Sequence, residues 1–131
     1  MKVLIYPSHR GMVYTPKMKE IMKKYKGIKC RTGEIIEYIE NNCVHCEGGS
    51  YDLIRANLVK DREKILKVKT IYSSDLDYVY WIYTESYGVA VFKIEEVDTS
   101  RPWTIESYDS CEYIKYLDER KCLDEELNYW E

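Results

Sequence analysis

The sequence predicts an α+β domain in which a mainly antiparallel β-sheet carries two helices packed on one face. Residues 78–97 and 102–116 each contain two β-prone runs on either side of a short polar turn, which is the pattern of a hairpin. Residues 15–26 and 32–41 instead repeat their apolar side chains at the spacing of an amphipathic helix. A chain of 131 residues, 45% of them hydrophobic, suits a single domain over residues 1–131 with a core of its own.

The first strand is expected at Lys2–Tyr6, where four apolar, β-prone residues follow the lysine and Pro7 ends the run. The loop after it contains His9, Arg10 and a glycine. Such a loop can hold an anion through side chains and backbone amides, and a guanidinium suits phosphate or carboxylate. Arg10, with His9 as a second donor, is therefore a candidate ligand-binding residue. The alternative is an ordinary surface turn.

Two helices follow in the sequence. The first is expected to begin with Thr15 as its N-cap and Pro16 in its first turn, and Gly27 marks its end. Its five lysines fall mostly off the apolar stripe, which favours a solvated basic face over a nucleic-acid interface. The second, through about Asn41, is expected to have Thr32 as its cap and to bury three isoleucines while its glutamates face solvent.

The most metal-like motif is C-x-x-C at Cys43–Cys46, because this spacing lets two thiolates bind one tetrahedral ion in a loop. A zinc signature needs a second pair at matching spacing, and Cys111 and Cys122 do not provide one. We therefore expect unligated cysteines, no metal and no cofactor. An odd total of five cysteines also fits poorly with a disulfide framework.

The middle of the chain is less definite. Residues 51–61 fit either a helix or an extended loop, and residues 63–72 alternate as a strand. The run from 78 to 84 is apolar on both faces, so this strand is either central or part of an interface. Tyr80 and Trp81 are therefore candidate ligand-binding residues.

The last hairpin has strands at 102–107 and 111–116. Trp103 is predicted to be buried, because alternation places it on one face with Ile105. Glu106 and Asp109 lie at or near the turn and are candidate ligand-binding residues; an ordinary polar turn is the alternative. An acidic segment follows, which suits a short terminal helix or a partner-binding tail.

Residues 103–114 carry a family resemblance. W-x-I-E-x-Y-D followed by E-Y-I resembles the closing signature of small uncharacterised bacteriophage and bacterial proteins. Looser similarity covers Lys2–Tyr14, Arg31–Glu40 and Leu66–Ile71, which resemble the opening strand, an R-x-D-P-x-L-I segment and an L-K-V-V-E-I strand of those proteins. The resemblance implies a shared architecture and a phage context, and it carries no catalytic residues.

The sequence departs from that family pattern in three places. Ser110 stands where glycine is usual, Thr32–Gly33 replaces Asp-Pro, and the region from Ile71 to Pro102 looks like an insertion.

Charge is unevenly distributed along the chain, whose net charge is −3. Residues 1–31 carry nine basic residues and one acid, whereas residues 72–131 carry five basic and fifteen acidic residues. This polarity suits packing of the two parts against each other, a site for anions, or association of copies into a homo-oligomer. The sequence contains no apolar run long enough for a membrane span and no signal peptide, so we expect a cytoplasmic protein without a membrane partner.

Three functions fit these observations. The favoured one is a phage-type binding protein that inhibits a host defence component, either by contacting a host protein or by sequestering a small anionic signalling nucleotide. Fourteen tyrosines suit such an interface. A small hydrolytic or nucleotide-modifying enzyme is the alternative, with Glu106 and Glu112 as a conceivable carboxylate pair, but no P-loop, GxSxG or HExxH motif is present. A nucleic-acid regulator is disfavoured by the acidic C-terminal half.

Overall fold

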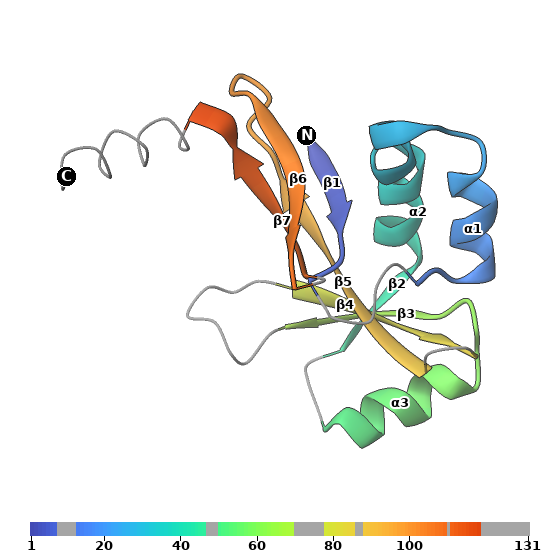
Figure 1. Ribbon diagram of the computed structural model, residues 1–131. Coiled ribbons are helices and arrows are strands. Elements are labelled where there is room, and N and C mark those ends of the chain that lie inside the picture. The colour runs from blue at the N-terminus through green and yellow to red at the C-terminus, as the bar shows by residue number, and fades with distance from the viewer. Residues whose placement is uncertain (8–12, 47–49, 70–77, 86–87, 110, 119–131) are drawn as a thin grey trace, which may run out of the picture.

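The computed structural model has a five-stranded sheet, a separate two-stranded sheet and helices on both faces of the larger sheet (Figure 1). It describes residues 1–7, 13–46, 50–69, 78–85, 88–109 and 111–118. The strand order of the larger sheet is β1-β5-β4-β3-β2. Its strands are β1 (Lys2–Ile5), β2 (Cys43–Cys46), β3 (Ile65–Lys69), β4 (Tyr78–Thr84) and β5 (Gly88–Glu96). All neighbours are antiparallel except β2 and β3, so the predicted α+β class is confirmed.

The two predicted helices pack on one face of this sheet. They are α1 (Pro16–Met22) and α2 (Glu34–Asn42), with a 3₁₀ helix, η1 (Gly27–Arg31), between them. Met18 of α1 and Ile39 of α2 are fully buried against a sheet layer that includes Leu4, Ile82 and Phe92. This cluster is the larger part of the hydrophobic core.

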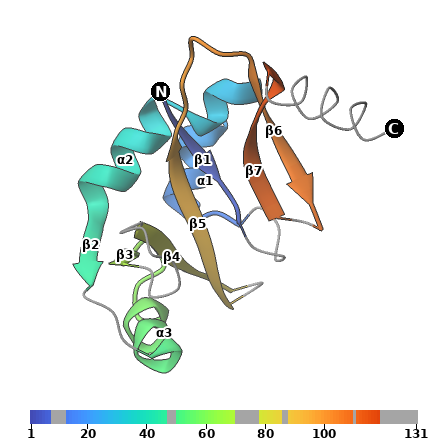
Figure 2. The same ribbon diagram turned by 90° about the vertical axis from the view of Figure 1, so that its left-hand side faces the viewer.

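The opposite face of the sheet is covered by two further elements. Helix α3 (Tyr51–Val59) buries Ile54 and Leu58 over β3, β4 and β5. A hairpin of β6 (Trp103–Tyr108) and β7 (Cys111–Tyr116) packs over Val3 and Ile5 of β1. Figure 2 shows the hairpin beside β1 and well apart from α3. The ambiguous segment after residue 50 is therefore a helix.

Several predicted boundaries need correction. Helix α1 ends at Met22 rather than near residue 26, and Gly27, whose φ is +63°, begins η1 instead of capping α1. Helix α2 is preceded by Gly33 at φ +65°, and Thr32 makes no side-chain cap for it. Thr15 does cap α1, because its side chain accepts a hydrogen bond from the Met18 amide.

The predicted C-terminal hairpin is confirmed, with Trp103 paired to Tyr116 and Tyr108 paired to Cys111. Trp103 is half-buried against Val3, Ile5 and Val97, so the prediction that it is buried is only partly right. A two-stranded sheet covers an edge of the core with one face only, and a large ring near its open end keeps part of its surface in solvent.

A largely buried ion pair connects the hairpin to the rest of the molecule. The Arg31 guanidinium donates hydrogen bonds of 2.7 and 2.8 Å to the two carboxylate oxygens of Glu112, and both side chains are only 15% exposed. Glu112 also accepts from the Tyr6 amide at 2.9 Å, while its own amide donates to the Tyr6 carbonyl. Arg31 further donates to the Leu4 carbonyl. Three segments far apart in sequence therefore meet at one carboxylate.

We expect Glu112→Gln to lower the free energy of unfolding by about 3 kcal/mol, because it keeps the shape of the side chain but leaves the largely buried guanidinium without its counter-charge. Urea unfolding followed by circular dichroism measures this.

Glu106→Gln is the matched control on the outer face of the same hairpin. Glu106 pairs with Lys115 at 3.3 Å, and these side chains are 33% and 28% exposed. The loss there should stay below about 1 kcal/mol. Equal losses for the two variants would show that the Arg31–Glu112 pair contributes no more than a surface pair.

Candidate functional site: a lysine–tyrosine pocket

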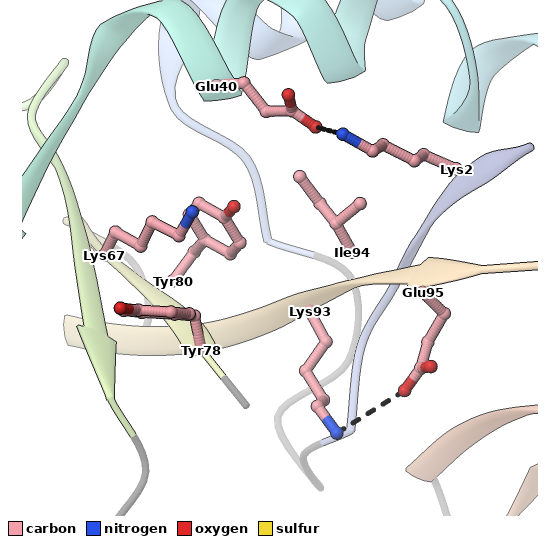
Figure 3. Close-up of a pocket in the computed structure, with 8 residues that line it drawn as sticks. All are labelled: Lys2, Glu40, Lys67, Tyr78, Tyr80, Lys93, Ile94 and Glu95. Carbon is pink, nitrogen blue, oxygen red and sulfur yellow. Dashed lines mark hydrogen bonds and ion pairs between the residues drawn. The ribbon is translucent and has the colours of Figure 1, made fainter. Parts of the chain in front are cut away.

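A pocket of about 250 Å³ opens beside the helix-covered face of the larger sheet, next to α2. Its walls come from β1, α2, β3, β4 and β5. We call it the lysine–tyrosine pocket, and its lining residues are Lys2, Glu40, Lys67, Tyr78, Tyr80, Lys93, Ile94 and Glu95. Figure 3 shows these side chains.

Strand register brings Lys67 and Tyr80 together. They are directly paired across β3 and β4, so their side chains share one face of the sheet. Tyr80 and Phe92 are the next pair across, with their rings stacked at a centroid separation of 5.3 Å. Tyr80 is thereby fixed at the floor of the pocket with only 4% of its surface exposed.

The Lys67 ammonium lies over aromatic rings instead of beside a carboxylate. Its nitrogen is 4.6 Å from the Tyr78 ring centre and 5.8 Å from the Tyr80 ring centre, within the range of cation–π attraction. Among the residues that the structure describes, no carboxylate lies within ion-pair distance of it. A ring face attracts the ammonium but supplies no counter-charge, so the described residues leave Lys67 without an anionic partner at the pocket.

The other two lysines are paired. Lys2 donates to Glu40 at 2.9 Å, and this hydrogen bond, followed by the charge of Glu40, raises the pKa of Lys2 above its ordinary value. Lys93 lies 3.4 Å from Glu95. Figure 3 shows Lys93 and Glu95 on the side of β5 that faces away from Ile94, so these two side chains form the rim of the pocket. Among the described lining residues, three lysines and two glutamates leave one lysine without a glutamate partner, and it is Lys67.

Tyr80 is a hydrogen-bond donor over the whole physiological range. Burial, with smaller contributions from the nearby Cys43 and Glu40, raises the pKa of Tyr80 from 10.0 to about 12. Its hydroxyl therefore stays protonated and neutral at pH 7. A neutral phenol beside a free ammonium is a suitable donor pair for an anionic oxygen.

Of the ligand-binding residues expected from the sequence, Tyr80 lies in this pocket. Tyr80 lines it, whereas Trp81 faces the opposite side of the sheet, with its ring 6.2 Å from that of Tyr51 in α3. Adjacent strand residues point to opposite faces, so Tyr80 and Trp81 cannot form one site. His9 and Arg10 lie outside the described residues.

The hairpin candidates also lie away from the pocket. Asp109 is exposed at the turn with φ at +52°, and Glu106 is engaged with Lys115 and with the Tyr113 hydroxyl. Glu106 faces outward while Glu112 faces the sheet, as their register across the hairpin requires. The suggestion that Glu106 and Glu112 form a catalytic carboxylate pair is therefore wrong, because two residues on opposite faces cannot act on one substrate atom.

The C-x-x-C motif lies in strand β2 instead of in a loop. Residues three apart in a strand point to opposite faces, and Cys43 packs with the α1–α2 cluster while Cys46 packs with the α3 cluster. The two sulfurs cannot bind the same ion without breaking the strand. Over the described part of the chain, no group of three or more potential metal ligands comes together.

The main residue that sequence reasoning missed is Lys67. Alternation places Ile65 and Lys67 on the same face of β3, and Ile65 is fully buried there. A lysine at a position where the pattern demands an apolar residue is a signal for a charged site at the edge of the core. Lys2 and Lys93 had no such signal, since only the order of the strands brings them to the same pocket.

Comparison with protein-family models, with curated proteins and with solved structures gave no significant match. Of the helices in the described ranges, none combines the length and the apolar character needed to cross a membrane.

The raised pKa of Tyr80 predicts a loss of stability at alkaline pH. In the unfolded chain the Tyr80 hydroxyl loses its proton near pH 10, whereas in the folded chain it keeps the proton until about pH 12. The contribution of Tyr80 to the free energy of unfolding is therefore complete below pH 10 and is lost as the pH rises through 12. Urea midpoints measured between pH 9 and 12 should fall less steeply for Tyr80→Phe than for the parent chain. Equally steep curves would contradict the assignment to Tyr80.

Proposed function

We propose that this chain is a non-enzymatic binding protein whose lysine–tyrosine pocket holds a small phosphate-bearing ligand. The observation that carries the proposal is the ammonium of Lys67, held over two tyrosine rings at a pocket and left without a carboxylate partner among the described residues. A half-buried charge of this kind is costly to keep, and an incoming anion would supply the missing partner.

The size and chemistry of the pocket support a small anion. A volume of about 250 Å³ is slightly below the ~300–1,000 Å³ of sites that enclose drug-sized molecules, so it suits a compact ligand or one end of a larger one. Lysine binds phosphate as a point charge, and the neutral Tyr80 hydroxyl adds a directional donor. Ile94 and the tyrosine rings supply apolar wall.

Binding is favoured over catalysis by the state of the carboxylates. A general base must be free to accept a proton from the reacting group. Both glutamates at the pocket are already engaged with lysines, Glu40 with Lys2 and Glu95 with Lys93. Among the described residues that line the pocket, none is a serine, threonine, cysteine or histidine that would serve as a nucleophile or proton shuttle.

An inhibitory role through sequestration follows from binding without turnover. A phage-encoded chain that held a signalling nucleotide would deprive a host defence system of its messenger, and the resemblance at residues 103–114 supports such a context. The alternative of a protein target has less support, because the tyrosine-rich strand β4 is covered by α1–α2 on one face and by α3 on the other. Its double-sided apolar pattern is accounted for by the core.

We expect Lys67→Ala to weaken the binding of inorganic pyrophosphate by roughly tenfold or more, the scale of one lost charged hydrogen bond. Isothermal titration calorimetry at low and moderate salt would measure this.

Lys29→Ala is the matched control, since Lys29 is an exposed lysine on η1 and its loss changes net charge equally. This variant should bind like the parent apart from a small salt-dependent effect. The same affinity for both variants, or an absence of binding to the parent, would remove the support for the pocket as a phosphate site.

A further inference from the structure

We infer that the ligand of this pocket is a mononucleotide, with its phosphate at Lys67 and its base against the ring of Tyr78. This inference rests on the proposed function, because it assumes that the pocket binds a phosphate. It adds the chemical class of the remainder of the ligand.

The position of Tyr78 is the first reason. Tyr78 is the first residue of β4 and is 38% exposed, whereas Tyr80 two residues later is almost completely buried. An exposed tyrosine ring provides a flat surface on which any base can stack. The ring is also held in place, because the Lys67 ammonium lies over it and the ring of His45 meets it at 77° with a centroid separation of 6.0 Å.

The second reason is the short distance between the charge and the ring. The Lys67 nitrogen is 4.6 Å from the centre of the Tyr78 ring, so an anion bound by Lys67 lies next to that ring. In a nucleotide the phosphate and the base are separated by only one sugar. A ligand that carried phosphate alone would leave Tyr78 and Ile94 in contact with water, while a base would cover apolar surface there.

Charge argues against a polynucleotide at the same place. Glu40 and Glu95 lie at the pocket beside the lysines, and the chain as a whole has a net charge of −3. A strand of nucleic acid needs a continuous basic track for successive phosphates. Among the described lining residues, one ammonium without a carboxylate partner, beside two glutamates that are paired with other lysines, instead suits a single phosphate group.

Calorimetry with four defined probes tests the inference. The probes are adenosine 5′-monophosphate, ribose 5-phosphate, adenosine and a short single-stranded oligoadenylate. The parent chain should bind adenosine 5′-monophosphate about tenfold more tightly than ribose 5-phosphate, which is the scale of one stacked base. Adenosine, which lacks the phosphate, should bind more weakly than the monophosphate.

Two variants separate the base from the phosphate. Tyr78→Leu keeps an apolar side chain but removes the aromatic face, so it should lower the affinity for adenosine 5′-monophosphate by about tenfold more than the affinity for ribose 5-phosphate. Tyr78→Phe should retain the preference for the base. Circular dichroism and thermal melting of both variants check that they are folded.

The outcomes distinguish the inference from the proposed function. If ribose 5-phosphate and the monophosphate bind equally, and both depend on Lys67, the phosphate site stands and the nucleotide inference is wrong. If oligoadenylate binds more tightly per nucleotide than the monophosphate, the ligand is a nucleic acid and the inference is wrong as well. If no phosphate-bearing probe binds, both fall together.

Discussion

The central constraint on this fold is that β4 and the first half of β5 are apolar on both faces. Tyr80, Ile82 and Phe92 face α1 and α2, while Trp81 and Val89 face α3. A strand of this kind cannot lie at a surface without exposing one row of large side chains to water. The molecule therefore needs cover on both sides of its sheet, and α3 and the terminal hairpin provide it opposite the helix pair. In the sheet, these two strands lie between β1 and β3.

The uneven charge of the chain is partly resolved by contacts within the molecule. Arg31, from the basic N-terminal part, binds Glu112 from the acidic C-terminal part, and the charged N-terminus binds Glu96. The Arg31 pair is by far the more buried of the two. Its bidentate geometry fixes how the hairpin sits on β1, and the backbone of Tyr6 completes the arrangement. Packing of the two parts against each other, one of the options that the charge pattern suits, is therefore present.

The lysine–tyrosine pocket lies at the edge of the sheet face that α2 covers. Next to Glu40 of α2, this face presents Lys67 and Tyr78 instead of aliphatic residues. Lys67 keeps its aliphatic stem on the sheet while its ammonium lies over aromatic rings. The arrangement places a charge next to apolar surface at the edge of the core. Such a combination is unfavourable for an empty surface and favourable for a ligand that carries both features.

The sequence by itself determined the class of the fold, the two helices on one face, both hairpins and the N-cap at Thr15, because these follow from local periodicity and local hydrogen bonding. It did not determine that Cys43–Cys46 is an edge strand parallel to β3. A run of four residues has too weak a pattern to predict a strand, and these residues adopt the strand conformation because they pair with β3. The pocket was even less accessible to sequence reasoning. Lys2, Lys67 and Lys93 lie on three strands whose order in the sheet differs from their order in the chain, so only the tertiary structure decided that they meet.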